Sequence, residues 1–250
     1  MQVIVNELLV SYEVSGKGPT VLFLHGWGDS GKGFHQLSAT VAKHFRIIVP
    51  DLPGFGGSQA PPSAWGLNEY VQLLQAFLDK VGVKSLFAVI GHSNGGAIAI
   101  RGVASENLRP ERLVLLAAAG IRNPYKGRNQ ALRLVAKSGK LLAKPLPKAA
   151  QLRLRRKLYA TVGSDMFVAE KLQETFKRVV SDDVRADAQR LNLPTLLIYG
   201  EADEQTPVSY GELFHELIAD SSLEVLPGVG HFVHHERLAE VTRSIMEFLT

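Results

Sequence analysis

The chain has 250 residues, 46% of them hydrophobic and 21% charged, so it can form one large α/β domain and lies outside the composition range of disordered proteins. The absence of cysteine excludes disulfides and thiolate metal sites. The first ten residues lack a basic flank and a small-residue cleavage site, and no uncharged run is apolar enough to span a bilayer. These features predict a cytoplasmic protein without a leader or a transmembrane segment.

The formal net charge of +4 hides a strong asymmetry along the chain. Between residues 121 and 157 there are 12 Lys and Arg and no acidic residue, whereas the rest of the chain carries 16 basic and 24 acidic residues. This pattern predicts a basic element on an acidic body. Three interpretations are open: a solvated helical face, steering of an anionic substrate or an acidic carrier protein, and attachment to an anionic membrane surface. Nucleic-acid binding is not predicted, because no recognition motif accompanies the charge.

Hydrophobic periodicity predicts strands that alternate with helices along most of the chain. In the first half we predict a hairpin over 2–16, a strand over 20–26, a helix over 30–45, a strand from 46 with a Pro/Gly-rich loop to 58, a helix over 67–81, a strand over 86–90, a helix over 95–106 and a strand over 112–120. Near the C-terminus we predict a strand over 195–200, a helix over 209–219, a strand over 223–227 and a last helix over about 236–249. This alternation predicts an α/β fold with a mostly parallel central sheet and helices on both faces.

The region from 121 to 190 interrupts the alternation, because it has helical periods and no strand pattern. An apolar face opposite a basic face predicts a helix that ends at the prolines 145 and 147, and three more helical pieces are predicted around 152–159, 166–176 and 179–189. We predict a helical cap over 121–190, inserted in a core formed by 1–120 and 191–250. Its aromatic residues, Phe176 among them, either line an acyl pocket or pack the cap on the core.

A serine lies at a change of period in the segment Gly91-His92-Ser93-Asn94-Gly95. A G-x-S-x-G motif between a strand and a helix is typical of a nucleophile elbow, in which the glycines permit a very sharp turn. The serine then projects at the carboxyl edge of the sheet, where open α/β sheets bind ligands. The motif alone is short, and a serine that only caps the helix also fits it.

A serine hydroxyl becomes a nucleophile only when a base takes its proton, and that base needs a carboxylate to orient it. In this architecture the expected chain order is serine, acid, histidine, with the last two on loops after later strands. Asp203 follows the strand predicted over 195–200, and His231 follows the strand predicted over 223–227. We therefore predict a catalytic triad of Ser93, Asp203 and His231.

Five motifs in one order resemble those of the α/β-hydrolase superfamily along the whole chain. Besides the elbow, four segments match. They are His25-Gly26-Trp27-Gly28 for the oxyanion loop, DLPGFGGS over 51–58 for the D-x-P-G-x-G-x-S turn, GEADEQTP over 200–207 for the acid loop and the Gly-His pair at 230–231. The resemblance implies that the backbone N–H groups of Trp27 and Asn94 form an oxyanion hole. It also implies an esterase that works through an acyl-enzyme, with no cofactor and no metal.

Other acidic residues compete for the role of the acid. Glu201 and Glu204 flank Asp203, but they fit the spacing of the superfamily less well. Asp51 lies before the nucleophile in chain order, and we expect it to be a structural residue of a turn.

The histidines near the motifs have competing interpretations too. His234 and His235 are compatible with a metal cluster around His231, but H-F-V-H-H lacks a metalloprotease spacing, and we expect partly exposed residues at the start of the last helix. We expect His25 to support the oxyanion loop through hydrogen bonds, and His92 to be a packing residue.

The leading functional hypothesis is a serine hydrolase that cleaves the carboxylic ester of a small molecule or of an anionic or carrier-linked substrate. The segment LHGWG and the basic region are similar to those of carboxylesterases that act on esters of an acidic carrier protein. The motif GHSNGG also resembles hydrolases that cleave carbon–carbon bonds, so the same triad acting on such bonds or on lactones is an alternative. A second alternative is a ligand receptor that has kept the fold without turnover.

Overall fold

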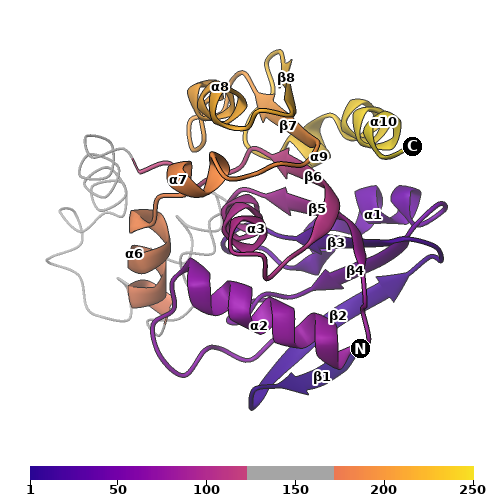
Figure 1. The fold of residues 1–250 in the computed structure, drawn as a ribbon, viewed down its shortest axis with the longest axis vertical. Helices are drawn as coiled ribbons and strands as arrows, with labels where there is room; N and C mark the ends of the chain where they lie inside the picture. Colours follow the sequence, from indigo (N-terminus) through magenta and orange to yellow (C-terminus); the bar gives the residue numbers. More distant parts are fainter. Residues whose placement is uncertain (123–171) are drawn as a thin grey trace, which may run out of the picture.

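The structure is a computed structural model in which residues 1–122 and 172–250 are described. Its centre is an eight-stranded sheet with the order β1-β2-β4-β3-β5-β6-β7-β8 (Figure 1). The strands are β1 (Gln2–Val5), β2 (Leu8–Ser15), β3 (Thr20–Leu24), β4 (Arg46–Pro50), β5 (Leu86–His92), β6 (Pro110–Leu116), β7 (Thr195–Gly200) and β8 (Ser221–Leu226). The β1–β2 and β2–β4 pairs are antiparallel, and all other pairs are parallel. The predicted mostly parallel sheet is confirmed.

Helices cover both faces of the sheet (Figure 1). The residues of the two hydrophobic clusters divide between the faces: α2 (Leu67–Lys80), α3 (Asn94–Ala104) and α8 (Val208–Leu217) contribute to one, and α1 (His35–Val41) and α10 (Leu238–Leu249) to the other. All five residues of β3 are buried, and alternate ones enter opposite clusters. A strand that packs against helices on both sides has no polar face, which explains why its sequence, TVLFL, is almost continuously apolar.

Some predicted elements end elsewhere than expected. The helix predicted over 30–45 begins as a short 3-10 helix, Gly31–Phe34, and ends at Val41. The strand predicted over 112–120 ends at Leu116, because Ala117 adopts a positive φ of 46° that interrupts extended backbone. The helix predicted over about 236–249 is α10, and a short helix that was not predicted, α9 (Val233–Glu236), precedes it.

Part of the predicted cap lies within the described residues. The predicted helices over 166–176 and 179–189 are replaced there by α6 (Gln173–Ser181) and α7 (Arg185–Ala188), so the predicted break between 176 and 179 is wrong. The helix breaks instead at Asp182, whose extended backbone lets its carboxylate accept hydrogen bonds from Leu67 N and from Arg101. The predicted helices over 131–144 and 152–159 lie outside the described residues, and the division of the chain at 120 and 190 stays a prediction.

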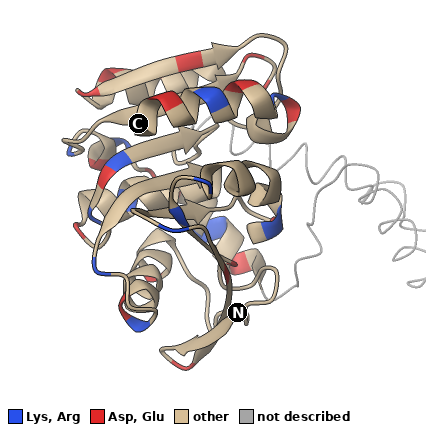
Figure 2. Ribbon diagram, turned by 90° about the vertical axis from the view of Figure 1, so that its right-hand side faces the viewer, with Lys and Arg blue, Asp and Glu red and all other residues tan. Residues whose placement is uncertain are grey.

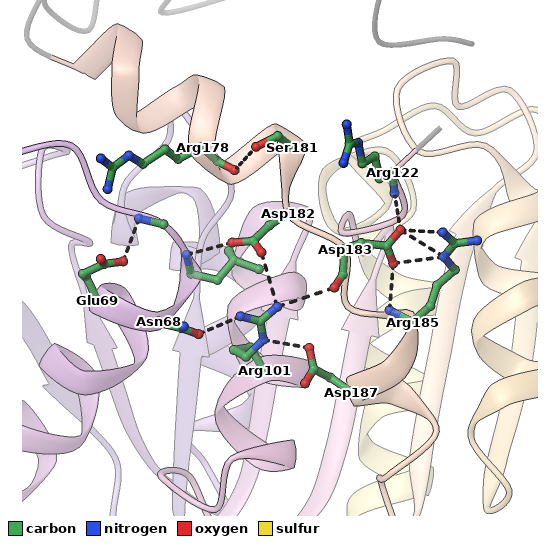
Figure 3. A network of polar contacts seen from close by, with 12 residues as sticks. Asn68, Glu69, Arg101, Arg122, Arg178, Ser181, Asp182, Asp183, Arg185 and Asp187 are labelled. Carbon is green, nitrogen blue, oxygen red and sulfur yellow. Dashed lines mark hydrogen bonds and ion pairs between the residues drawn. The ribbon is translucent and has the colours of Figure 1, made fainter. Parts of the chain in front are cut away.

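Arg101 of α3 ties the segment after α6 to the core (Figure 3). Its Nε donates to Asp187 Oδ2 at 2.7 Å, its Nη1 to Asn68 Oδ1 at 2.6 Å, and its Nη2 to Asp182 Oδ1 at 3.3 Å. The Arg101 side chain is only 17% exposed, and those of Asp182 and Asp187 are 28% and 16% exposed. One guanidinium therefore joins α3 to α2 and to both ends of the 182–187 segment.

We expect Arg101→Met to lower the free energy of unfolding by about 2 kcal/mol, since it leaves two partly buried carboxylates without their charged donor. Arg109 is a matched control, because its ion pair with Glu106 is about three-quarters exposed on both sides. Urea unfolding should separate the two: Arg109→Met is expected to stay within about 0.5 kcal/mol of the wild type. Equal effects of both substitutions would show that Arg101 does not hold the segment in place.

The described residues comprise 16 basic and 22 acidic residues, so this part of the molecule is acidic as a whole. In Figure 2 both signs occur on its helices and strands. Nearly all of the basic region over 121–157 lies outside the described residues. Within residues 1–122 and 172–250, no helix has the length and apolar character needed to cross a bilayer.

Candidate active site

Ser93 lies in the turn between β5 and α3, with φ 51° and ψ −116°. A non-glycine residue rarely adopts such a conformation, which persists only where the surroundings enforce it. Both flanking glycines are required by close approach: a Cβ on Gly91 would lie 2.7 Å from Gly95 O, and one on Gly95 would collide with the carbonyl oxygen of Leu24. The start of α3 therefore packs directly on the sheet and holds the serine in its strained turn.

The three residues predicted as a triad come together from separate loops at the carboxyl ends of β5, β7 and β8. Ser93 Oγ lies 3.0 Å from His231 Nε2, and His231 Nδ1 lies 2.7 Å from Asp203 Oδ2. The side chains of His231 and Asp203 are 7% and 0% exposed, while Ser93 is partly buried. With the proton on Nδ1, donated to the carboxylate, Nε2 is free to accept the hydroxyl proton of the serine.

Asp203 is held as a carboxylate by its neighbours. Burial favours the neutral acid and raises the pKa, but hydrogen bonds from His231 and Thr206 outweigh it and hold the pKa of Asp203 below its ordinary value. Thr206, which the sequence analysis missed, lies three residues after the acid, a spacing at which a hydroxyl can return to a carboxylate. The Thr206 hydroxyl also lies 3.0 Å from Ala117 O, a contact that joins residues 89 positions apart and has no local sequence signal.

The loop after β3 lies against the serine. A Cβ on Gly26 would lie 3.0 Å from His92 Nδ1 and 3.2 Å from Ser93 Cβ, closer than ordinary contact, so a larger residue would push the loop and these neighbours apart. Within the described part of the chain, the backbone N–H groups of Trp27 and Asn94 donate no hydrogen bond. Asn94 is the first residue of α3, where an N–H group has no partner within the helix. Within residues 1–122 and 172–250, the N–H groups of both predicted oxyanion donors therefore have no hydrogen-bond acceptor.

His25 supports this loop, as predicted. Its Nδ1 donates to Gly26 O at 2.8 Å, and its Nε2 accepts from Leu52 N at 2.9 Å, an arrangement that only the neutral ring can satisfy. Burial lowers the pKa of His25 and so favours that neutral ring. The ring of Trp27 lies with its centroid 5.1 Å from that of Phe176 on α6, so this predicted cap aromatic packs against the loop.

The expectation that His234 is partly exposed at the start of the last helix is wrong. His234 is 1% exposed, and its ring packs between those of Phe34 and His92, with centroids 5.0 and 4.6 Å away, whereas His235 is exposed. Burial, with the nearby His235 and His231, lowers the pKa of His234 to about 3, so the ring is neutral. The helix α9 begins two residues after His231 and turns His234 inward, which the spacing did not reveal.

His92 is buried as expected, and it also contacts the loop that carries His231. Its Nε2 donates to the backbone carbonyl of His231 at 3.1 Å. Burial, reinforced by His234 and His231, lowers the pKa of His92 well below its ordinary value. The residue before the nucleophile therefore links the elbow to the histidine loop as a neutral donor.

The competing acidic residues lie away from His231. Glu201 and Glu204 are exposed, and the carboxylate of Glu201 accepts instead from Gly228 N at 2.9 Å. Asp51 accepts from Gly31 N and Gly57 N at 2.7 and 2.8 Å, the role of a structural turn residue. Among the residues that the structure describes, no group of three His, Asp or Glu side chains is arranged to hold a metal ion.

Known proteins resemble this chain along most of its length. The model of the alpha/beta hydrolase family matches residues 21–243. The pimeloyl-[acyl-carrier protein] methyl ester esterase of Chromobacterium violaceum is 28% identical over 95% of this chain and 96% of its own length. The 2-hydroxy-6-oxo-2,4-heptadienoate hydrolase of Pseudomonas putida is 24% identical over 94% of this chain and 90% of its own length.

A solved structure, the enol-lactonase of Burkholderia xenovorans LB400, superposes with a TM-score of 0.77 at 21% identity and covers 100% of this chain and 99% of the enzyme. At that identity the likeness shows a shared fold. The family match spans most of the chain, and the sheet order, the turn at Ser93 and the solved relative all agree with it. The chain belongs to the alpha/beta hydrolase family.

Proposed function

We propose that the protein is a serine hydrolase that cleaves a carboxylic ester through an acyl-enzyme intermediate. The observation that carries this proposal is the continuous row of hydrogen-bond contacts from Ser93 Oγ through the His231 ring to the Asp203 carboxylate. A row of this kind activates a hydroxyl that is otherwise a poor nucleophile. The membership of the chain in a family of hydrolases supports the same assignment.

Each residue has one chemical task in this proposal. Ser93 Oγ bonds to the ester carbonyl carbon while His231 Nε2 takes its proton, and the same nitrogen returns that proton to the departing alcohol oxygen. Water then attacks the acyl-enzyme in the same way and releases the acid and the free serine. Asp203 keeps the proton of His231 on Nδ1, and the N–H groups of Trp27 and Asn94 hold the carbonyl oxygen as it becomes negative.

For the substrate we propose an anionic or carrier-linked ester, bound beneath a cap formed by residues 121–190. The relative from C. violaceum, a methyl ester esterase of an acyl-carrier protein substrate, supports this class. So does the charge pattern, since the 12 basic residues between 121 and 157 suit an acidic carrier better than a neutral ester. An anionic membrane surface is the other partner that this charge allows.

Carbon–carbon hydrolysis is the second candidate, and the relative from P. putida favours it, since its name describes a hydrolase of an oxo-dienoate. The same three residues serve both reactions, so the substrate has to be tested. Lactone hydrolysis uses the same acyl-enzyme chemistry. A receptor without turnover needs no activated serine, and this property separates it from the enzymes.

A fluorophosphonate probe and a substrate panel test the proposal together. We expect stoichiometric labelling of Ser93 and turnover of methyl esters, fastest when the acyl group is anionic or attached to an acyl-carrier protein. For the carrier-linked ester, kcat/KM is expected to fall several-fold between 50 and 300 mM salt, because ions screen the basic region, whereas a neutral ester should change little.

Other outcomes would change the proposal, each in a different part. Turnover of a vinylogous diketone or a lactone but of no ester would make the corresponding alternative the activity. Absence of labelling would support the receptor and overturn the serine mechanism. An equal salt response for charged and neutral esters would remove the carrier from the proposal.

A further inference from the structure

Thr206 contacts two members of the proposed triad at once. The residue is 4% exposed and lies in the loop between β7 and α8. Its Oγ1 is 2.7 Å from Asp203 Oδ2 and 3.1 Å from His231 Nδ1. On its other side it is 3.0 Å from the carbonyl oxygen of Ala117, which follows β6. The hydroxyl thus lies where the acid, the base and the end of a central strand meet.

Thr206 also completes the set of donors around the carboxylate. A carboxylate has about four acceptor positions, two on each oxygen. On Asp203, Oδ1 accepts from Gln205 N at 2.7 Å and from Thr206 N at 3.0 Å, while Oδ2 faces His231 Nδ1 and Thr206 Oγ1, each at 2.7 Å. Among the described residues, Thr206 therefore supplies two of the four donors, and its hydroxyl is the only donor besides His231 on the oxygen that faces the histidine.

The single hydroxyl proton has two acceptors within reach, Asp203 Oδ2 and Ala117 O. The carboxylate is charged and lies 0.3 Å closer than the carbonyl, by the distances of 2.7 and 3.0 Å, and hydrogen bonds to charged acceptors are both shorter and stronger. The proton is therefore directed to Asp203. The contact with Ala117 fixes where the hydroxyl oxygen lies.

On the basis of the proposed function, we infer that Thr206 is a positioning residue, which orients the Asp203 carboxylate toward His231 and shares its negative charge. The backbone amides of residues 205 and 206 hold only the Oδ1 oxygen. With these two donors alone, the carboxylate could still rotate about the Oδ1 position. A second donor on Oδ2 stops this rotation. It also takes up part of the charge that the carboxylate would otherwise give entirely to the imidazolium ring.

The titratable groups around His231 come from four elements. Asp203 faces Nδ1, His92 of β5 and His234 of α9 pack against the ring or its neighbours, and Tyr199 of β7 lies near the carboxylate. Burial holds the pKa values of His92 and His234 low and that of Tyr199 high, so all three stay neutral around pH 7. Asp203 is then the charged group in contact with His231 in the described structure, and the donors on its carboxylate decide how much of its negative charge faces the ring.

Thr206→Val removes the hydroxyl and keeps the shape of the side chain. We expect kcat to fall about tenfold, because the carboxylate loses its orientation. KM should stay nearly unchanged, because the substrate-binding site is not altered. The acidic limb of the pH–rate profile should move up by about half a pH unit, since a carboxylate with one donor fewer stabilises the imidazolium more. Thr206→Ser keeps the hydroxyl and should restore both properties.

An NMR titration of the His231 ring tests the inference without any substrate. The signal is assigned by its loss in His231→Gln, and the midpoints are compared among wild type, Thr206→Val and Thr206→Ser. A higher midpoint in Thr206→Val alone supports the inference, and equal midpoints in all three overturn it. Thr206→Ala provides the same comparison if the valine variant does not fold.

The titration also separates this inference from the proposed function. The wild type could hydrolyse no substrate while the His231 midpoint is still higher in Thr206→Val than in the wild type. That result would overturn the serine mechanism and leave the role of Thr206 intact. A residue that only stabilises the fold would lower Tm in both Thr206→Val and Thr206→Ser and would move neither the midpoint nor the ratio of kcat to KM. That result would overturn the positioning role.

Discussion

Ser93→Ala is expected to lower kcat by about 10⁴ to 10⁶-fold on the best ester of the panel, with Tm within about 3 °C of the wild type. Ser93 Oγ is the hydroxyl within hydrogen-bond distance of His231 Nε2, so its removal takes away the atom that forms the acyl-enzyme. Alanine tolerates the φ of 51° no better and no worse than serine, and the turn should persist. Steady-state kinetics and thermal unfolding measure the two quantities.

Ser105 is the matched control for this substitution. It lies just after the other end of α3, where its hydroxyl donates to Arg101 O at 2.8 Å. Ser105→Ala should leave kcat unchanged within about twofold, and the fluorophosphonate should still label this variant fully. Residual activity of Ser93→Ala above a few per cent of the wild type would mean that another group attacks the substrate.

Asp203→Asn is expected to lower kcat by about 10⁴-fold with little change in the fold. The structure indicates how the amide would lie. Its oxygen must occupy the Oδ1 position, where two backbone N–H groups donate, and its NH₂ group then faces His231 Nδ1. An NH₂ group donates a proton there, which forces the ring proton onto Nε2. The histidine then faces Ser93 with a donor and accepts no proton from the hydroxyl.

Two glutamates of the same loop are controls for this prediction. Glu201 and Glu204 are exposed, and neither carboxylate contacts His231. Glu201→Gln and Glu204→Gln should keep kcat/KM within about twofold of the wild type. If one of them instead lost activity while Asp203→Asn kept it, the acid of the mechanism would have to be reassigned to that glutamate.

The strands, the helices of the core and the grouping of the site could be predicted because local patterns determine them. Strands buried on both faces are apolar throughout, amphipathic helices repeat every three to four residues, and glycines mark the turn at Ser93. The chain order of Ser93, Asp203 and His231 then places all three at one edge of a parallel sheet. None of these inferences requires knowledge of contacts between distant segments.

The features that could not be predicted depend on such distant contacts. The end of α6 is determined at Asp182, which binds Leu67 N across 115 positions, and an amphipathic pattern does not contain that information. The burial of His234 follows from the space between Phe34 and His92, two residues far away in the sequence. The same holds for Thr206, whose hydroxyl is held by the carbonyl of Ala117.

The packing of Phe176 on Trp27 joins α6 to the loop after β3. Trp27 supplies a proposed oxyanion amide, and Phe176 lies on α6, within the region predicted to form the cap. A substitution on α6 that shifts Phe176 can therefore displace the proposed oxyanion amide. Under the proposed mechanism, substitutions on α6 that alter substrate selectivity would also alter the reaction rate, and they would call for compensating changes around that aromatic pair.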